Sequence, residues 1–561
     1  MSSSPTSLTN SQRVLYWLPR VVTAVLVPIL LFGLAEGALR LFNVGLPLDP
    51  TRPCQVDGKA EVCDNFPFAS AFLPPGMLRM PRPFAFPAEK SADSYRIVIL
   101  GESAAYGDPD PAYGFSRYLE VMLRRRYPGV NFEVINTSIT ATNSHAILPI
   151  VRDMVRYHPD LFISYTGSNE VVGPFGAGTI FTSTNLPLPL IRGEIWLNST
   201  RLGQLVNMER ASDPKKRQQW RGMEMFLSQQ VPADAPGLPS VYRNFETNLR
   251  DAAAEARRGG AQLLLSTVIT NLKDCAPFAS AHPKNLAPEA LQTWNQLGQK
   301  GVLLEDAGDF QGALQYYRKA AEIDANYAEL QFRIARCLGG LGDFAGARDA
   351  YQKARDLDTL RFRADTRINQ IVRRAGANSG QGVKLVDAEA VFAEASPHGI
   401  IGSELLCDHV HLNPEGNYLL ARTILNEVEN MLPSQIRAKA SSNEVASEEE
   451  CERQLALTRY DRARLASENI ERMQRAPFTT QINHQELLMR LGMLVSNPET
   501  PEETAQQYQW ALANSPKDYM LHLNFGRFLS QFNREAALNE FRQARPYHDT
   551  PFMAPDGTLV Q

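Results

Sequence analysis

Short apolar runs alternate with amphipathic stretches through the middle of the chain. Runs typical of buried strands occur at 95–101, 132–136, 160–167, 261–269 and 383–389. Segments with helical spacing, such as 145–159, lie between the earlier runs. Because a parallel pair of strands needs a crossover of about a dozen residues or more, this alternation predicts a parallel sheet with helices on both faces, an α/β fold.

A longer apolar segment runs from Val21 to Phe42 and is interrupted only by Glu36 and Arg40. A helix of roughly 20 apolar residues can span a bilayer, so we predict a single transmembrane anchor near the N-terminus. A cleaved signal peptide is the alternative, but its apolar core is normally about 7 to 15 residues long. Positive charges lie on both sides and do not decide the orientation. The position in the chain favours a cytosolic N-terminus and a periplasmic or otherwise extracytoplasmic body.

Two long insertions interrupt the alternating pattern. The first, 171–245, begins with a segment rich in Gly, Pro and Thr, and we predict that it forms a rim or lid. In the second, six positions recur after 34 residues, namely Gly308, Asp309, Phe310, Ala313, Tyr317 and Ala320 with Gly342, Asp343, Phe344, Ala347, Tyr351 and Ala354. This period resembles tetratricopeptide repeats. Packing of each helix pair on the next explains the pattern, and the repeat alone implies no ligand.

The flanking segments are less regular. The Pro-rich stretch 46–92 predicts an extended linker on the surface. Residues 436–470 predict a polar connector or a solvated helix, and a degenerate repeat pair follows at Tyr508, Ala511, Pro516, Gly526, Ala537, Phe541 and Ala544. The expected divisions are 1–45 for the tail and anchor, 46–92 for the linker, 93–285 and 367–435 for the two parts of an α/β domain, 286–366 for the repeat insertion, and 436–561 for a C-terminal helical region.

Composition narrows the function classes. The chain of 561 residues exceeds one ordinary core, and with 44% hydrophobic and 21% charged residues most of it should fold. A formal charge of -4 and the absence of a basic stripe exclude nucleic acid as an expected partner. Cys54 and Cys63 bracket a short polar loop and are either free thiols or a disulfide; a location outside the cytosol favours the disulfide.

Polar blocks follow the predicted strands. Ser103 lies where the first strand ends and a helix begins, near the backbone N–H groups that stabilise an alkoxide, although a helix-capping role is the common alternative. Asp408 and His411 lie three apart before the last helix and can supply a carboxylate and a base from one loop. His409 is interpreted as a surface histidine.

Two further blocks, 136–142 and 165–170, follow the second and third strands and offer donors for an oxyanion. Together the four blocks resemble those of the SGNH hydrolases, the GDSL-like esterase superfamily, in order and spacing. The resemblance implies a flavodoxin-like three-layer α/β/α domain. It also implies a serine nucleophile at Ser103, the Asp408–His411 pair, and an oxyanion hole formed by Ser103, Ala141 and Asn169.

Three positions depart from the family pattern. Glu102 stands before the serine where the family commonly has aspartate, and Glu170 follows Asn169 where the family commonly has aspartate. Ala141 occupies a position that usually holds glycine. Its backbone N–H survives, but a positive φ there would cost on the order of 1 kcal/mol because of the methyl group. A Gly-x-Ser-x-Gly elbow is absent, which argues against an ordinary α/β-hydrolase.

These observations predict a membrane-anchored serine ester hydrolase that acts on acyl esters. Water or a sugar hydroxyl would accept the acyl group, and O-acetylated envelope polysaccharide is the favoured substrate class, ahead of lipid esters. No cofactor or metal is expected, since no Cys/His cluster has zinc-ligand spacing. The alternatives are an O-acyltransferase with the same mechanism, or an assembly scaffold whose repeats bind a protein partner and whose hydrolase domain is vestigial.

Overall fold

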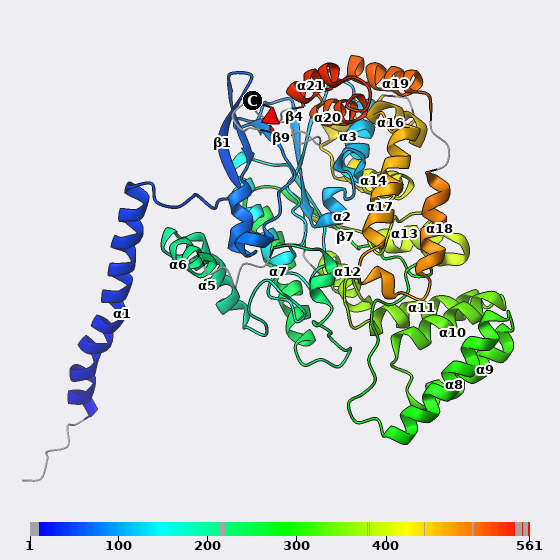
Figure 1. The fold of residues 1–561 in the computed structure, drawn as a ribbon. Coiled ribbons are helices and arrows are strands. Elements are labelled where there is room, and N and C mark those ends of the chain that lie inside the picture. Colours follow the sequence, from blue (N-terminus) through cyan, green and yellow to red (C-terminus); the bar gives the residue numbers. More distant parts are fainter. Residues whose placement is uncertain are drawn as a thin grey trace, which may run out of the picture.

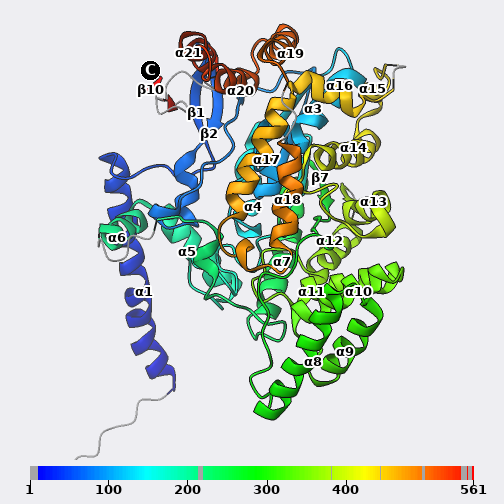
Figure 2. The ribbon, with the colours of Figure 1, turned by 45° about the vertical axis from the view of Figure 1, so that its right-hand side comes forward.

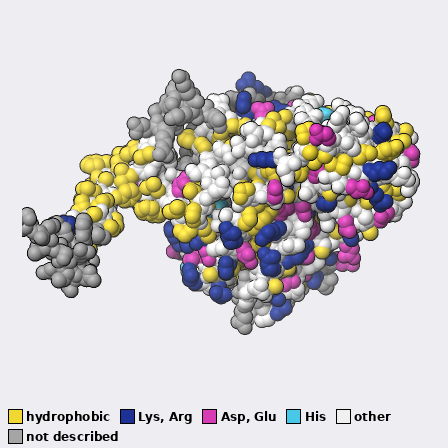
Figure 3. Space-filling model, turned by 90° about the horizontal axis from the view of Figure 1, so that it is seen from below, with side chains coloured by type: hydrophobic (Ala, Val, Ile, Leu, Met, Phe, Trp, Pro, Cys, Tyr) yellow, Lys and Arg dark blue, Asp and Glu magenta, His cyan; other side chains and the backbone are white. Residues whose placement is uncertain are grey.

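The protein is described by a computed structural model that covers residues 10–212, 219–378, 380, 382–441, 444–495, 499–544, 552–553 and 559–560 (Figure 1). Helix α1 (Asn10–Leu41) contains the apolar segment Val22–Leu41, which is long and apolar enough to cross a membrane and is not buried against the body. Figure 3 shows its hydrophobic side chains standing clear of the rest of the molecule. A signal sequence has the same properties, so the helix supports a membrane location without deciding orientation.

Five strands form a central sheet in which every neighbouring pair is parallel. They are β4 (Ser94–Gly101), β5 (Asn131–Asn136), β6 (Leu161–Tyr165), β7 (Gln262–Ser266) and β8 (Val383–Val386). Their order is β5-β4-β6-β7-β8, which is 2-1-3-4-5 in chain order and therefore flavodoxin-like. All eight residues of β4 are buried, as expected for a parallel strand covered on both faces. The predicted fold class is confirmed.

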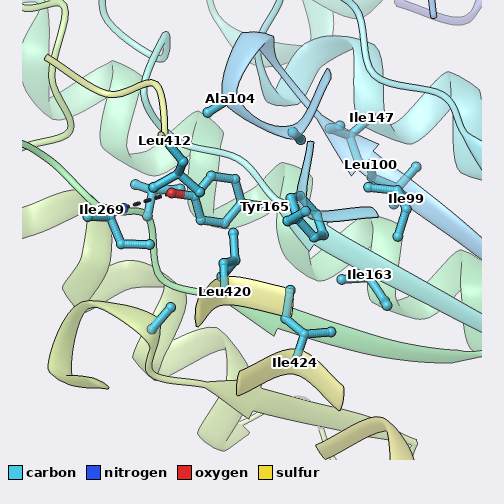
Figure 4. Close-up of a cluster of buried hydrophobic side chains, with 14 of the residues drawn as sticks. Ile99, Leu100, Ala104, Ile147, Ile163, Tyr165, Ile269, Leu412, Leu420 and Ile424 are labelled. Carbon is cyan, nitrogen blue, oxygen red and sulfur yellow. Dashed lines mark hydrogen bonds between the residues drawn. The ribbon is translucent and has the colours of Figure 1, made fainter. Parts of the chain in front are cut away.

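Helices cover both faces of this sheet. On one face α3 (Phe115–Arg126) packs against α14 (Pro414–Met431), with α13 (Ala388–Ala395) beside α14. The other face carries α4 (Ser144–Met154), α7 (Leu238–Arg258) and α12 (Thr366–Asn378), which pack on one another. Figure 4 shows the core between sheet and helix, where Leu420 and Ile424 of α14 lie with Ile163 and Tyr165 of β6.

The segment 46–92 differs from the predicted extended linker. It forms an antiparallel sheet of β1 (Thr51–Val56), β2 (Lys59–Asp64) and β3 (Ala85–Pro87), and a disulfide joins Cys54 to Cys63. Its apolar side chains are buried in the main core, namely Phe68, Phe72, Leu73, Met77 and Phe86. The prolines suggested an exposed chain, but burial of these apolar side chains between the prolines outweighs that local tendency.

The first insertion contains α5 (Leu188–Ser199) and α6 (Arg201–Ser212), which lies against α1. The second consists of four antiparallel helices, α8 (Pro288–Asp306), α9 (Phe310–Ile323), α10 (Ala328–Gly340) and α11 (Phe344–Leu357), each packed on the next. The repeated Gly-Asp pair has a structural role: Gly308 and Gly342 adopt positive φ, and Asp309 and Asp343 cap the helices that follow.

The two ends of the repeat insertion are clasped together at its base. The carboxylate of Asp358 accepts hydrogen bonds from the backbone N–H groups of Phe278 (2.9 Å) and Ala279 (3.1 Å). Thr359 N–H also donates to the carbonyl of Ala279 at 3.1 Å. The chain therefore leaves the α/β domain and returns to it at nearly one point.

The C-terminal helices are α15 (Ser434–Arg437), α16 (Glu448–Leu455), α17 (Arg459–Met473), α18 (His484–Leu494), α19 (Pro501–Asn514), α20 (Tyr519–Leu529) and α21 (Arg534–Gln543). The prediction of a polar connector at 436–470 is wrong. Leu465, Ala466 and Asn469 on one side of α17 are buried, and Arg464 forms an ion pair with Asp110 at 2.6 Å. Figure 2 shows α17 and α18 lying side by side against the body.

Short elements complete the chain. The 3-10 turns are η1 (Phe66–Ala71), η2 (Pro75–Met77), η3 (Pro111–Tyr113), η4 (Val155–Tyr157), η5 (Met223–Phe226), η6 (Pro397–Gly399) and η7 (Phe478–Thr480). Two-residue strands β9 (Phe552–Met553) and β10 (Leu559–Val560) pair near the C-terminus. The division into domains stays a prediction.

Candidate active site

A hydrogen-bonded chain of three side chains lies at the carboxyl edge of the sheet. Ser103 is the first residue of α2 (Ser103–Tyr106), directly after β4. Its Oγ is 2.8 Å from His411 Nε2, and His411 Nδ1 is 2.7 Å from Asp408 Oδ2. The structure thus brings together the serine, the histidine and the carboxylate that were predicted from distant parts of the sequence.

Hydrogen bonds within the Asp408 loop fix the positions of the Asp408 carboxylate and the His411 imidazole relative to each other. Asp408 Oδ1 accepts the backbone N–H groups of Val410 (3.0 Å) and His411 (2.9 Å), a local turn that leaves Oδ2 for the imidazole. The side-chain amide of Asn271 donates to the carbonyl of Asp408 at 3.0 Å, tying this loop to the segment after β7. The histidine is therefore oriented with Nε2 toward the serine.

Charges around the imidazole set its protonation. Burial on its own would lower the pKa of His411, but the carboxylates of Asp408 and Asp108 outweigh it and leave the pKa above its ordinary value. Burial would raise the pKa of Asp408, yet His411 and His409 hold it well below the usual range. Asp408 is consequently ionised at neutral pH and stabilises an imidazolium on His411.

The predicted oxyanion residues come from the loops after β5 and β6. Ala141 has φ of 61°, in the left-handed region that favours glycine, so its methyl group is accommodated at a steric cost. Ala141 and Asn169 line the same cavity as Ser103. The loops after β5 and β6 therefore both contribute to the cavity that contains Ser103.

Glu102 holds the loop after β6 in place through several hydrogen bonds. Its buried carboxylate accepts hydrogen bonds from Thr166 Oγ1 (2.6 Å) and from the backbone N–H groups of Gly167 (3.0 Å) and Asn169 (3.0 Å). Burial raises the pKa of Glu102 to about 7, against the opposing effect of these hydrogen bonds. Glu102, the residue before Ser103, therefore links the end of β4 to the Asn169 loop, a contact that the family pattern alone did not indicate.

Two charged residues that contact the Asp408–His411 pair escaped the sequence analysis. Arg472, in the last turn of α17, donates to Asp408 Oδ2 at 3.0 Å and to Asp108 Oδ1 at 2.6 Å. Asp108 Oδ2 in turn lies 3.4 Å from His411 Nε2. The acidic block after Ser103 could have signalled Asp108. Nothing local marks Arg472, because its role depends on how α17 docks.

The interpretation of His409 as a surface residue is wrong. It is 5% exposed, and its Nδ1 lies 3.1 Å from Asp408 Oδ1. Its ring packs edge-on against Phe278 and Phe478, at centroid distances of 5.5 and 5.7 Å. Burial lowers the pKa of His409, so this ring forms a neutral wall of the site. The prediction failed because residues 408–412 are all buried in the structure.

A cavity of about 450 Å³ opens in front of Ser103. Part of its wall comes from the first insertion, as the rim prediction required, with Phe181, Trp220 and Phe226. The C-terminal helices supply Arg472 and Phe478. Segments outside the central sheet therefore shape the space in which a substrate would lie.

Two side-chain groups among the described residues have metal-ligand spacing. Asp408, His409 and His411 offer ligand atoms within 4.8 Å of one another, but Asp408 and His411 already use these atoms in the hydrogen bonds to each other and to Ser103. The second group is Glu415, Glu448 and Glu452, where Arg462 bridges Glu415 and Glu452 at 2.7 and 2.5 Å. Glu448 takes no part in this bridge, and its Oε1 is buried without a hydrogen-bond partner among the described residues.

Comparison with known proteins gives one sequence match and several structural ones. Residues 304–364 match the tetratricopeptide repeat family, and no curated protein matches the chain. Among solved structures, a variant of an acetyl-xylooligosaccharide esterase from Geobacillus Stearmophilus is 12% identical at a TM-score of 0.26, covering 60% of this chain and 94% of that chain. A GDSL-like lipase from Bacteroides thetaiotaomicron is 12% identical at a TM-score of 0.25, and the match covers 60% of this chain and 89% of the lipase. TesA is 13% identical at a TM-score of 0.24, and the match covers 60% of this chain and 99% of TesA.

Because these TM-scores are low, the fold class is assigned from the strand order and the helix layers of this chain. The repeat match covers α9, α10 and α11 together with the end of α8, in agreement with the predicted period. The chain therefore resembles the SGNH hydrolases in its 2-1-3-4-5 sheet and in the arrangement of its Ser, Asp, His and Asn side chains, and it carries a tetratricopeptide repeat at residues 304–364.

Proposed function

We propose that the protein is a serine ester hydrolase in which Ser103 is the nucleophile, His411 the general base and Asp408 the carboxylate that orients it. The observation that carries this proposal is the unbroken hydrogen-bond chain from Asp408 through His411 to Ser103 Oγ. A serine hydroxyl is a weak nucleophile on its own, and this arrangement is the one that activates it.

In the proposed mechanism His411 Nε2 takes the proton of Ser103 Oγ as the oxygen attacks the acyl carbon. The negative charge that develops on the carbonyl oxygen is stabilised by the N–H groups of Ser103 and Ala141 and by the amide of Asn169. Collapse of the tetrahedral intermediate expels the alcohol, which receives the proton from His411. Water, activated by the same imidazole, then releases the acyl group and restores Ser103.

The environment of this site suggests where it works. We propose that α1 is a retained membrane anchor and that the body lies outside the cytosol. The disulfide between Cys54 and Cys63 supports an oxidising compartment. In that location O-acetyl groups of an envelope polysaccharide are the preferred substrate class, and transfer of the acyl group to a sugar hydroxyl by the same machinery is the alternative reaction.

A scaffold function is the second candidate, favoured by the repeat match at 304–364. A cleft of about 430 Å³ on α8 and α10, lined by Trp294, Tyr327 and Arg333, would take a partner peptide. The two functions are compatible, because this cleft and the Ser103 cavity are lined by different residues.

Labelling with a fluorophosphonate distinguishes an enzyme from a scaffold with a vestigial site. Full-length protein in detergent should be labelled and should hydrolyse a short-chain aryl ester, whereas Ser103→Ala should lose both properties. Equal labelling and equal hydrolysis in wild type and Ser103→Ala would overturn the enzyme proposal.

A further inference from the structure

The outer wall of the Ser103 cavity contains an arginine held in a fixed position. The guanidinium of Arg79 lies over the ring of Trp220, 3.9 Å from its centroid. The backbone N–H of Trp220 donates to the backbone carbonyl of Gly76 at 3.1 Å. This bond joins the segment of the first insertion to the segment that carries Arg79. Arg79 and Trp220 both line the cavity. Stacking on an indole restricts the guanidinium while leaving its N–H groups able to donate.

Arg79 has no carboxylate partner within ion-pair distance among the described residues, although its side chain is only half exposed. Burial lowers the pKa of Arg79 to about 10, so it remains a cation at neutral pH. The one carboxylate that raises this pKa is Asp108, which is already hydrogen-bonded to Arg472. A half-buried cation without a counter-ion is costly, and an anionic ligand would relieve that cost.

The other charges on the cavity wall do not supply this counter-ion. Arg221 Nε lies 3.4 Å from Glu224, and Glu468 lies 2.9 Å from Arg464, so these groups are paired in place. Glu471 and Arg475 also line the cavity and are exposed. Of the two half-buried arginines in the described part of the wall, Arg472 is paired with Asp108 and Asp408, whereas Arg79 has no carboxylate within ion-pair distance.

Aromatic rings line the same cavity as Arg79. Trp220 and Phe226 stand edge-on at a centroid distance of 6.3 Å, and Phe362 packs edge-on against Phe226 at 5.3 Å. Flat apolar walls of this kind suit a sugar ring, which offers C–H groups on its faces and polar groups at its edge. A cation at the edge of an aromatic wall therefore matches a sugar that carries a negative group.

We propose that Arg79 binds a carboxylate of the substrate, so that the preferred ester is an O-acylated acidic saccharide containing uronic acid residues. The proposal rests on the esterase function of Ser103 and names the substrate class of that same site. The guanidinium fork pairs with a carboxylate through two N–H groups, which places the neighbouring acylated hydroxyl relative to Ser103. Selectivity then arises from the rim of the cavity and not from the three hydrogen-bonded side chains.

The test compares two polymers with full-length protein in detergent at low salt. Acetate release from O-acetylated polygalacturonate and from O-acetylated xylan gives a ratio of kcat/KM values for the acidic and the neutral ester. Arg79→Met should lower this ratio by about 10- to 100-fold, mainly through KM, because one charge-assisted contact is removed. Arg79→Lys should restore part of the ratio, since the charge returns without the fork.

The matched control is Arg318→Met. Arg318 is an exposed arginine on α9 that does not line the cavity, so its replacement should leave the ratio unchanged. Unacetylated polygalacturonate should also inhibit hydrolysis of a neutral aryl ester by wild-type protein competitively, and less so as salt rises. This measurement tests the inference even if Arg79→Met fails to fold.

The outcomes separate the two proposals. Ser103-dependent hydrolysis with no preference for the acidic polymer, or with a ratio that Arg79→Met does not change, overturns the carboxylate inference and leaves the esterase function standing. If no ester is hydrolysed in a Ser103-dependent manner, the proposed function fails and the inference fails with it.

Discussion

The edge of the central sheet and the outer wall of the cavity are built in opposite ways. At the sheet edge, Ser103, Ala141, Asn169 and the Asp408 loop each follow a strand or precede a helix, so the fold class alone brings them together. The wall is assembled from three segments outside the sheet, which contribute Arg79, Trp220 and Arg472. The sheet edge brings together the hydrogen-bonded Ser103, His411 and Asp408, whereas the wall contributes Arg472 beside them and shapes the space in front of them.

The largest effect should come from the sheet edge. Ser103→Ala and His411→Ala should each lower kcat by roughly 10⁴ to 10⁶, and the double variant should be no worse than the single ones because these residues act as a unit. Steady-state hydrolysis of an aryl ester measures this. Losses that multiply in the double variant would contradict the proposed relay.

Removal of the wall residue Arg472 should have the next largest effect. In Arg472→Met the carboxylates of Asp108 and Asp408 lose a shared partner, so the free energy of unfolding should fall by on the order of 1 to 3 kcal/mol. Arg472 also lowers the pKa of His411, so its loss should raise that pKa further and move the acid limb of kcat/KM to higher pH. Denaturant unfolding and a pH–rate profile check both effects.

Asp108→Asn should shift the same profile in the other direction. Asp108 raises the pKa of His411, so the neutral amide should let that pKa fall and should move the acid limb to lower pH, where the free base is needed. Opposite shifts in Asp108→Asn and Arg472→Met are the result expected of electrostatic tuning. Shifts in the same direction would contradict electrostatic tuning of His411 by these two residues.

The smallest effect should come from Ala141→Gly. With φ of 61° at this residue, removal of the methyl should relieve steric strain and stabilise the fold by a few tenths to about 1 kcal/mol, partly offset by unfolded-state entropy. The same change should leave kcat equal or higher. A thermal melt measures the change in stability, and steady-state kinetics measure kcat. A threefold or greater loss of kcat would show that the side chain itself serves the site.

The contrast between edge and wall also explains what the sequence could predict. The strands, the period of 34 and the strand-end blocks depend on residues near one another in the chain, so local patterns predict them. Arg472 sits on a helix without a motif, Arg79 in a Pro-rich stretch expected to be a linker, and His409 in a loop expected to be exposed. Their roles arise from the docking of distant segments, which no short-range periodicity records.

The clasp at the base of the repeat insertion bears on how the chain reaches its native state. The last strand of the central sheet, β8, must find β7 across the whole insertion, yet loop-closure entropy rises by only about 0.6 kcal/mol for each doubling of loop length. Since Asp358 holds Phe278 and Ala279, a folded insertion behaves as a much shorter loop. Folding of the insertion should therefore favour the pairing of β8 with β7, and buried Arg355 of α11 adds bonds from the insertion to Thr270 and Thr366 of the α/β domain.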